Sequence, residues 1–248
     1  MSALAIKIIA CVTMLIDHTA ETLNIVGILP YGVLYEIMRS IGRIAFPLFC
    51  FQLALGVNYS KNRWKYLLRL LLFAVISEIP FDFALFGGFS WAHQSVYVTL
   101  LLGFVCVAVM KWASGLSGKK AVGGFIAWGL VTVFSAALAE TVLHTDYGAA
   151  GVLAIAVMGF LVLPEETLTK TFGSYKAAEM VFFGAGVAIL TISSQNELFA
   201  MFGLAAVWAY NGERGYQGKV VQWLGYAFYP VHLAALALIF VMPKVFGW

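Results

Sequence analysis

Nearly every part of this chain lies in an apolar run long enough to cross a lipid bilayer, which takes about 20 residues as a helix. Of the 248 residues, 62% are hydrophobic and 11% are charged, whereas a soluble domain carries roughly a quarter charged residues. No polar stretch remains that could fold as a soluble domain. The sequence therefore predicts an all-α, polytopic membrane protein in which residues 1–248 form a single integral membrane domain.

The apolar runs predict about nine spanning helices joined by short loops. Lys and Arg gather in the second, fourth, sixth and eighth loops, and the loops between these hold none. Because basic loops stay in the cytoplasm, we expect a cytoplasmic N-terminus and an external C-terminus, with Lys244 as the one exception. The expected spans are residues 4–28, 33–58, 65–86, 94–112, 121–140, 148–163, 176–193, 197–210 and 220–241.

The first span has no basic segment before it and no small-residue cleavage site after a short apolar core, so we interpret it as a retained helix rather than a signal peptide. The three cysteines, Cys11, Cys50 and Cys106, lie in apolar segments without short spacing. This pattern argues against a disulfide framework and a metal site. Glycine-rich patches at residues 123–124, 148–151 and 184–186 predict close approaches between helices.

The stretch from Met38 to Asp82 interrupts this apolar pattern. Arg39 and Arg43 lie four residues apart, on one helical face, and Glu78 lies deep in the next span. A charge in hydrocarbon costs at least a few kcal/mol, so such residues face a bundle interior and mark a site. We therefore expect these three side chains to face the interior of the bundle.

Helical rise converts sequence position into depth in the membrane. His18 lies about 21 Å along its span, Arg39 and Arg43 lie roughly 10 and 16 Å from the outer side, and Glu78 and His232 lie about 18–20 Å from the inner side. These depths fall in one slab between the bilayer centre and its outer edge. The sequence thus predicts one shared polar chamber, with Asp82, His93 and Asp146 near its external rim.

Each of these residues also has a structural interpretation. A lone histidine in a helix is more often a hydrogen-bonded core residue than a catalyst. Asp17 and His18 point about 100° apart on their helix, so we expect Asp17 to pair with Arg39 or Arg43. His18 is then oriented from another helix, with Glu78 as the leading candidate. For the chamber as a whole, function is favoured over structural pairing.

Six motifs extend this pattern over almost the whole chain. They are Lys7-Ile8-Ile9-Ala10 leading to Asp17-His18; Arg39-x-x-Gly42-Arg43-x-Ala45-Phe46-Pro47; Tyr66-Leu67-Leu68-Arg69-Leu70; Ile76-Ser77-Glu78-Ile79-Pro80-Phe81-Asp82; Asp146-Tyr147-Gly148 with Gly151; and Tyr229-Pro230-Val231-His232-Leu233. On these motifs the chain resembles the TraX family of membrane proteins, named for conjugative-pilin acetylation and related to the integral-membrane acyltransferases. It departs from the family pattern at Gln94-Ser95, where Asn is expected after Gln.

The resemblance implies transfer of an acetyl group from acetyl-CoA to an amine or hydroxyl acceptor in the bacterial cytoplasmic (inner) membrane. In the named family activity the acceptor is the N-terminal amine of pilin; another envelope or small-molecule acceptor stays open, and so does a homo-oligomer. The lipid bilayer is an expected partner. No metal and no nucleic acid are expected.

Acyl transfer needs a base, a donor for the thioester oxyanion and anchors for the phosphates of the acyl donor. We assign the base to His18, with His232 as a second acid or base. Either Arg39 or Arg43 polarises the thioester carbonyl while the other holds a carboxylate. The expected catalytic residues are Asp17, His18, Arg39, Arg43, Glu78 and His232. The expected acetyl-CoA contacts are Arg63, Lys65, Arg69, Lys119 and Arg214, and the expected acceptor contacts are Asp82, Gln94, Ser95, Asp146, Tyr147 and Tyr229.

An alternative function is a proton-coupled carrier, with Asp17, His18, Glu78 and His232 as a proton relay. Many carriers show repeated halves with matched broken helices, and no such repeat is evident in this sequence. A purely structural subunit is a third alternative. It predicts that the buried charges pair and leave no open cavity.

Overall fold

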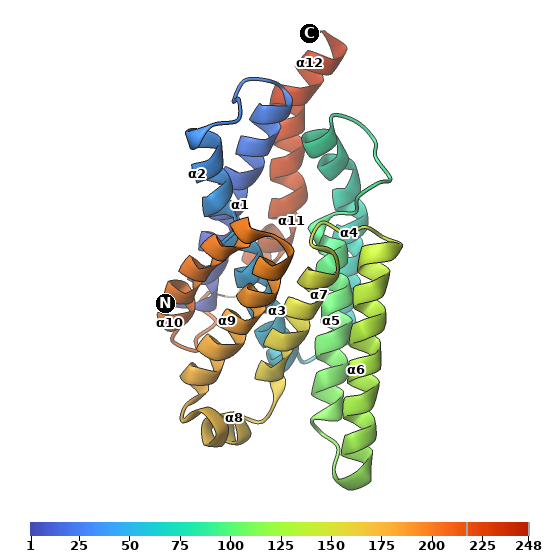
Figure 1. Ribbon diagram of the computed structural model, residues 1–248, viewed down its shortest axis with the longest axis vertical. Coiled ribbons are helices and arrows are strands. Elements are labelled where there is room, and N and C mark those ends of the chain that lie inside the picture. Colours follow the sequence, from blue (N-terminus) through green and yellow to red (C-terminus); the bar gives the residue numbers. More distant parts are fainter. Residues whose placement is uncertain (217, 248) are drawn as a thin grey trace.

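The structure, a computed structural model, describes residues 1–216 and 218–247, and this part of the chain is helical with no strand (Figure 1). All nine predicted segments are helical. By length and apolar composition, six described helices can cross a membrane, or seven if a pair bent by 102° counts as one span. The predicted count of nine spans and the sidedness therefore stay predictions. The helices are α1 (Ala3–Ile25), α2 (Val33–Gly42), α3 (Ala45–Tyr59), α4 (Arg63–Phe86), α5 (Val96–Ala113), α6 (Gly118–Thr141), α7 (Gly148–Met158), η1 (Gly159–Val162), α8 (Glu165–Phe172), α9 (Tyr175–Ser193), η2 (Gln195–Phe202), α10 (Gly203–Trp208), α11 (Lys219–Leu236), η3 (Ala237–Val241) and α12 (Met242–Phe246).

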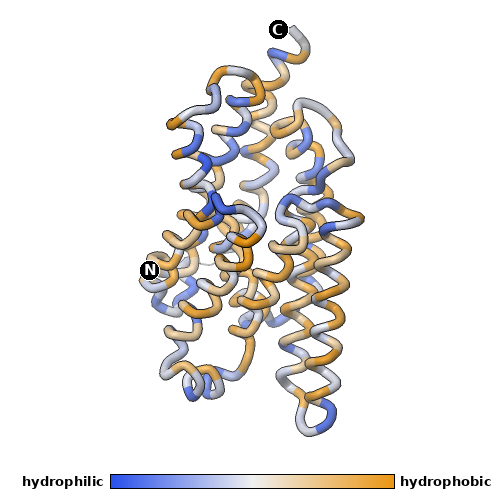
Figure 2. Tube along the Cα trace, viewed as in Figure 1, coloured by the Kyte–Doolittle hydropathy of each residue, from blue (hydrophilic) through white to orange (hydrophobic). Residues whose placement is uncertain are grey.

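The helices form an elongated bundle. In Figure 1, α1, α2, α4 and α11 occupy the upper part of the view, and α5 to α9 extend to its lower end. Figure 2 shows α6 apolar along most of its length, with hydrophilic residues in the loop at its lower end, whereas the helices in the upper part of the view also contain hydrophilic residues. Such a surface suits contact with lipid. The exposed apolar side chains of α6 include Val122, Phe125, Ile126, Leu130, Val133 and Phe134.

Proline explains two irregularities of the helices near the centre of the molecule. The helix expected at residues 33–58 is interrupted at Arg43 and Ile44, between α2 and α3, although residues 33–59 still form one candidate span. Pro47 explains the interruption, because it has no N–H to donate to the carbonyl of Arg43. Pro230 likewise leaves the carbonyl of Tyr226 without its helical donor, and the Tyr97 hydroxyl of α5 donates to that oxygen at 2.8 Å. Both prolines thus alter the backbone close to the predicted chamber.

Loops that the sequence places on the same side of the membrane contact one another. Near the N-terminus, Ala3 N donates to Glu213 O at 2.8 Å, and Arg214 donates to Tyr59 O at 2.9 Å. At the opposite ends of their helices, Lys244 Nζ donates to Val26 O at 2.6 Å. Lys244, the exception to the charge pattern, thus caps the C-terminal end of α1.

Close helix approaches involve some of the predicted glycines. A Cβ added to Gly124, Gly151 or Gly186 would lie within 3 Å of a neighbouring side chain, whereas Gly123 and Gly184 face open space. In the patches at residues 123–124 and 184–186, therefore, only one of the glycines lies in a tight contact, whereas Gly148 and Gly151 both do.

A very tight contact joins α1 to α2 at Gly42. A Cβ on Gly42 would lie 2.2 Å from Asp17 Cβ. We expect Gly42→Ala to displace α2 and to lower the free energy of unfolding by about 1–3 kcal/mol. Gly129→Ala is the matched control, because nothing lies within 4 Å of that position. Denaturant unfolding in detergent measures both variants; equal stability of the two would contradict this packing.

Candidate functional site

One cavity of about 520 Å³ lies where α1, α2, α5 and α11 meet η2 and the loops before α5 and α7. Its walls carry many ionisable side chains, together with an apolar side formed by residues such as Phe46, Phe49 and Leu100. The structure thus places a polar chamber inside the bundle. His18, Arg39 and Arg43 line it, as the sequence predicts, whereas Glu78 and His232 do not. The charged and histidine residues of its walls are Asp17, His18, Glu21, Arg39, Arg43, His93, Glu140, His144, Asp146 and Glu197.

The expected pairing of Asp17 is present with both arginines. Asp17 Oδ1 lies 3.0 Å from Arg39 Nη1 and 3.2 Å from Arg43 Nη2. The two guanidinium groups are on successive turns of the same span and converge on one carboxylate of α1. Asp17, which is 9% exposed, therefore links α1 to α2 by charge-assisted hydrogen bonds in the wall of the cavity.

Three further residues complete this network, and the site prediction does not include them. Tyr35 donates to Glu21 Oε2 at 2.7 Å, and Arg39 Nε lies 3.5 Å from the same oxygen. Glu197 Oε1 accepts from Arg43 Nη1 at 2.9 Å, while its Oε2 has no hydrogen-bond partner in the described part of the chain. Glu21 could be found from sequence, because it lies one turn after Asp17. Glu197 is 154 residues from Arg43 and has no local signal.

The two arginines differ in how fully their donors are used. Arg43 donates from Nε to the carbonyl of Arg39 and from its two terminal nitrogens to Glu197 and Asp17. The guanidinium group of Arg39 forms ion pairs only with Asp17 and Glu21 among the described residues, and the Arg39 side chain is 25% exposed against 15% for Arg43. Arg39 therefore has the more available guanidinium group in the cavity wall.

The orientation of His18 differs from the prediction. His18 Nδ1 lies 2.7 Å from His232 Nε2 of α11, and the two rings are nearly parallel, at 7°. Glu78 does not contact His18: its carboxylate accepts from the Ser95 N–H at 3.1 Å and from the Ser95 hydroxyl at 2.7 Å. The expected orientation of His18 by Glu78 is thus wrong, because Glu78 caps the start of α5 instead.

Asp82, one turn after Glu78, also binds the loop before α5. Its Oδ2 accepts from the Ser90 N–H at 3.1 Å. Neither carboxylate lines the cavity. We therefore interpret Glu78 and Asp82 as groups that hold the loop at residues 87–95 against α4, and not as groups that touch a substrate.

This interpretation predicts a stability effect for Glu78→Gln. The amide can accept only through its one oxygen, so a bond to Ser95 is weakened, and we expect unfolding to become easier by about 1–3 kcal/mol. The exposed Glu166→Gln, expected to change stability by less than about 0.5 kcal/mol, is the control for thermal unfolding in detergent. Equal stability of the Glu78→Gln and Glu166→Gln variants would contradict this role of Glu78.

The six expected acceptor contacts divide into two groups. Asp146, Tyr147 and Tyr229 line the cavity, whereas Asp82, Gln94 and Ser95 do not. Gln94 has a backbone role: its N–H donates to His144 O at 3.2 Å, and its carbonyl accepts from Asp146 N at 2.9 Å. The loops before α5 and α7 are therefore joined to each other at the edge of the cavity.

Asp146, in the loop before α7, is open to the cavity although protein surrounds it. Burial raises the pKa of Asp146 to about 6, with the nearby Arg43 opposing this shift and Asp17 adding to it. Tyr147 follows and stacks on Phe46, with 3.7 Å between ring centroids. This side of the cavity thus combines an acidic group with an aromatic pair.

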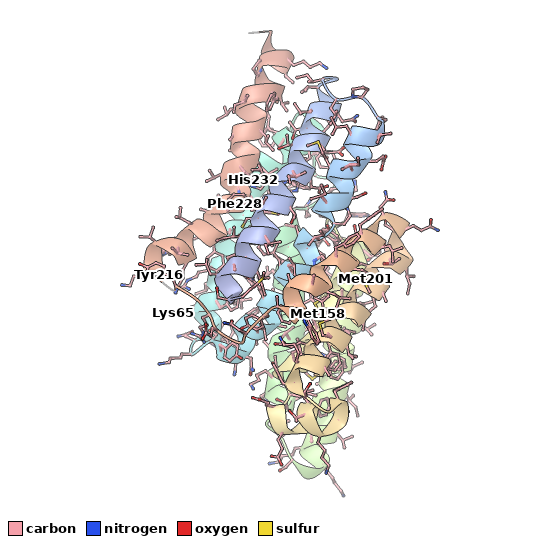
Figure 3. The ribbon with its side chains drawn as sticks, turned by 90° about the vertical axis from the view of Figure 1, so that its left-hand side faces the viewer. Lys65, Met158, Met201, Tyr216, Phe228 and His232 are labelled. Atoms are coloured by element: carbon pink, nitrogen blue, oxygen red, sulfur yellow. The ribbon has the colours of Figure 1, made fainter. Side chains whose placement is uncertain are left out.

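None of the five expected acetyl-CoA contacts lines the cavity. Figure 3 shows Lys65 well below His232 along the molecule. Arg69 lies over the Trp223 ring at 5.9 Å, and Arg214 lies over the Tyr59 ring at 5.2 Å. The roles of Arg63, Lys65, Arg69, Lys119 and Arg214 stay predictions. Among the described residues, no group of three His, Cys, Asp or Glu side chains could hold a metal ion.

Comparison with known proteins agrees with the motifs. The family model described as "TraX protein" matches residues 2–240. The chain is also 30% identical, over 253 aligned positions, to a protein of Dichelobacter nodosus described as "Probable fimbrial assembly protein FimC, serogroup H1", with 95% of this chain and 94% of that protein covered. No solved structure matches the chain significantly. The chain belongs to the TraX protein family.

Proposed function

We propose that this chain is a membrane-embedded acetyltransferase that moves the acetyl group of acetyl-CoA to an amine of a pilin or fimbrial subunit. The observation that carries the proposal is the joint presence of His18 and Arg39 in the wall of one cavity. A neutral imidazole can remove a proton near neutral pH, and a guanidinium group can stabilise a developing oxyanion. Acyl transfer requires both functions.

In the proposed reaction, the acceptor ammonium first loses one proton through His18 to solvent. The neutral amine attacks the thioester carbonyl, and Arg39 donates hydrogen bonds to the oxygen as its negative charge forms. The nitrogen then gives a second proton to His18, the C–S bond breaks, and His18 returns that proton to the sulfur of CoA. The products are an acetamide and CoA with a free thiol.

The charges of the cavity favour an amine over a hydroxyl acceptor. Around Arg39 and Arg43 lie three carboxylates, those of Asp17, Glu21 and Glu197. Two further acidic residues, Glu140 and Asp146, line the same cavity. The excess of negative charge attracts a cation such as a protein N-terminus. A pilin-type acceptor agrees with the name of the Dichelobacter nodosus relative, a probable fimbrial assembly protein.

In this proposal, the acyl donor approaches the cavity between α1 and α11. Gly225 of α11 lines the cavity only about 9 Å from the start of that helix, by helical rise. Lys7 of α1 crosses at this position, with its Nζ 3.4 Å from where a Cβ of Gly225 would lie. In this proposal the pantetheine arm passes Gly225, and Lys7 meets phosphate charge near the cytoplasmic ends of the helices.

The carrier alternative has less support. Its proton relay includes Glu78, and that carboxylate binds Ser95 outside the cavity. Two assays on purified protein in vesicles distinguish an acetyltransferase from a proton-coupled carrier. We expect label to pass from radioactive acetyl-CoA to a peptide with a free N-terminal amine and not to the N-terminally blocked peptide. Proton-driven solute uptake without label transfer would contradict the acetyltransferase.

A further inference from the structure

The hydrogen bonds of His232 determine which of its nitrogens carries a proton. His232 Nδ1 lies 2.7 Å from the carbonyl oxygen of Phe228, one turn earlier on α11; Figure 3 labels both residues on this helix. A carbonyl oxygen only accepts hydrogen bonds. His232 Nδ1 must therefore be the donor. In a neutral ring, the other nitrogen, Nε2, then has a lone pair and accepts.

The donor and acceptor nitrogens of His18 follow from those of His232. Its Nδ1 lies 2.7 Å from His232 Nε2, and since that nitrogen accepts, His18 Nδ1 must donate. A neutral His18 then keeps its lone pair on Nε2. His18 lines the cavity and is 8% exposed, whereas His232, 6% exposed, does not line the cavity.

The opposite arrangement requires a buried charge. If His232 carried protons on both nitrogens, its Nε2 would donate to His18, and His18 Nε2 would carry a proton and could not act as a base. Among the described residues no carboxylate pairs with either ring, because Asp17 and Glu197 bind the arginines. A buried imidazolium without a carboxylate partner is costly, so the neutral pair is favoured.

We infer that His232 is a positioning residue: it receives the Nδ1 proton of His18 and so leaves His18 Nε2 as the free base in the cavity. The chain of hydrogen bonds runs from His18 through His232 to the Phe228 carbonyl. The role as a base rests on the proposed function, but the protonation pattern does not. The inference and the proposed function can therefore fail separately.

Nitrogen-15 NMR of histidine-labelled protein in lipid tests the protonation pattern directly. In a His93→Gln, His144→Asn background only the two rings of interest remain, and asparagine suits the φ of 47° at residue 144. We expect both rings to be neutral and protonated at Nδ1 at neutral pH. Protonation of His18 at Nε2, or a doubly protonated ring, would overturn the inference whether or not acetyl transfer is found.

A pair of substitutions of His232 tests the positioning role. In His232→Gln the side-chain oxygen of the new amide can still accept from His18 Nδ1, whereas His232→Leu removes the acceptor. We expect His232→Gln to keep the His18 Nδ1–H signal and most of kcat. His232→Leu should lose that signal and lower kcat about 10- to 100-fold, with little change in KM. Equal spectra and equal kcat in the two folded variants would contradict the role.

Discussion

Under the proposed function, replacing His18 with glutamine is expected to lower the rate of acetyl transfer by about 10²- to 10⁴-fold, because a positioned general base contributes about that factor. Glutamine keeps a polar side chain in the cavity wall, so the fold should persist. The effect should appear in kcat, since in the proposed reaction His18 acts in the transition state and contributes little to binding. Transfer of label from acetyl-CoA to a free-amine peptide, with unfolding followed in parallel, measures both properties.

Thr19→Val is the matched control on the same helix. Thr19 is the next residue, but its hydroxyl donates to the carbonyl of Leu15 within α1 at 2.7 Å and does not line the cavity. This variant should transfer acetyl at the parental rate. If His18→Gln folded normally and also kept the parental rate, His18 would not be the base.

The second large effect concerns the difference between Arg43 and Arg39. Arg43→Met leaves Glu197, which is 4% exposed, without the ion pair that Arg43 supplies to it. Breaking a buried pair in this way costs about 3–5 kcal/mol of folding free energy. Arg39→Met should cost less, because Asp17 keeps Arg43. Denaturant unfolding in detergent measures the order of the two.

For activity, the two variants should rank in the opposite order, with Arg39→Met losing more than Arg43→Met. If Arg39 polarises the thioester carbonyl, folded Arg39→Met loses about 10²- to 10³-fold in kcat, as expected for removal of one oxyanion donor. Arg43→Met combined with Glu197→Gln removes both charges, so it should regain much of the stability that Arg43→Met loses. A double variant no more stable than the single one would contradict the pairing, and a larger loss of kcat for Arg43→Met than for Arg39→Met would exchange the two roles.

Much of the fold could be predicted because membrane helices are encoded by local composition. The nine apolar segments are all helical in the structure, and most of the charges deep within them face a cavity, because hydrocarbon excludes them. The break between α2 and α3 is also local, since Pro47 follows Arg43 by four residues. Whether every segment spans the bilayer depends on the arrangement of the whole bundle, and composition alone does not determine it.

The contacts of the site could be predicted from sequence only for residues that share one face of a helix. Arg39 and Arg43 share a face, so their joint contact with Asp17 follows once α1 and α2 pack together. The hydrogen-bond partner of His18 could not be predicted in this way. Glu78 and His232 lie at similar depths, and the choice between them depends on how α1 crosses α11. That crossing is set by the packing of side chains that lie far apart in the sequence. The spacing of residues within one helix therefore does not predict it.

The central claim is that an acetyl group is transferred from acetyl-CoA to its acceptor beside His18. It is tested most directly with bromoacetyl-CoA. This analogue places an electrophilic carbon where the acetyl group of the donor would lie, and His18 Nε2 can displace its bromide. Mass spectrometry of the digested protein is predicted to find the CoA-bearing adduct on His18, diminished by excess acetyl-CoA and absent from His18→Gln. Adducts confined to residues outside the cavity, or labelling that acetyl-CoA does not reduce, would contradict the account.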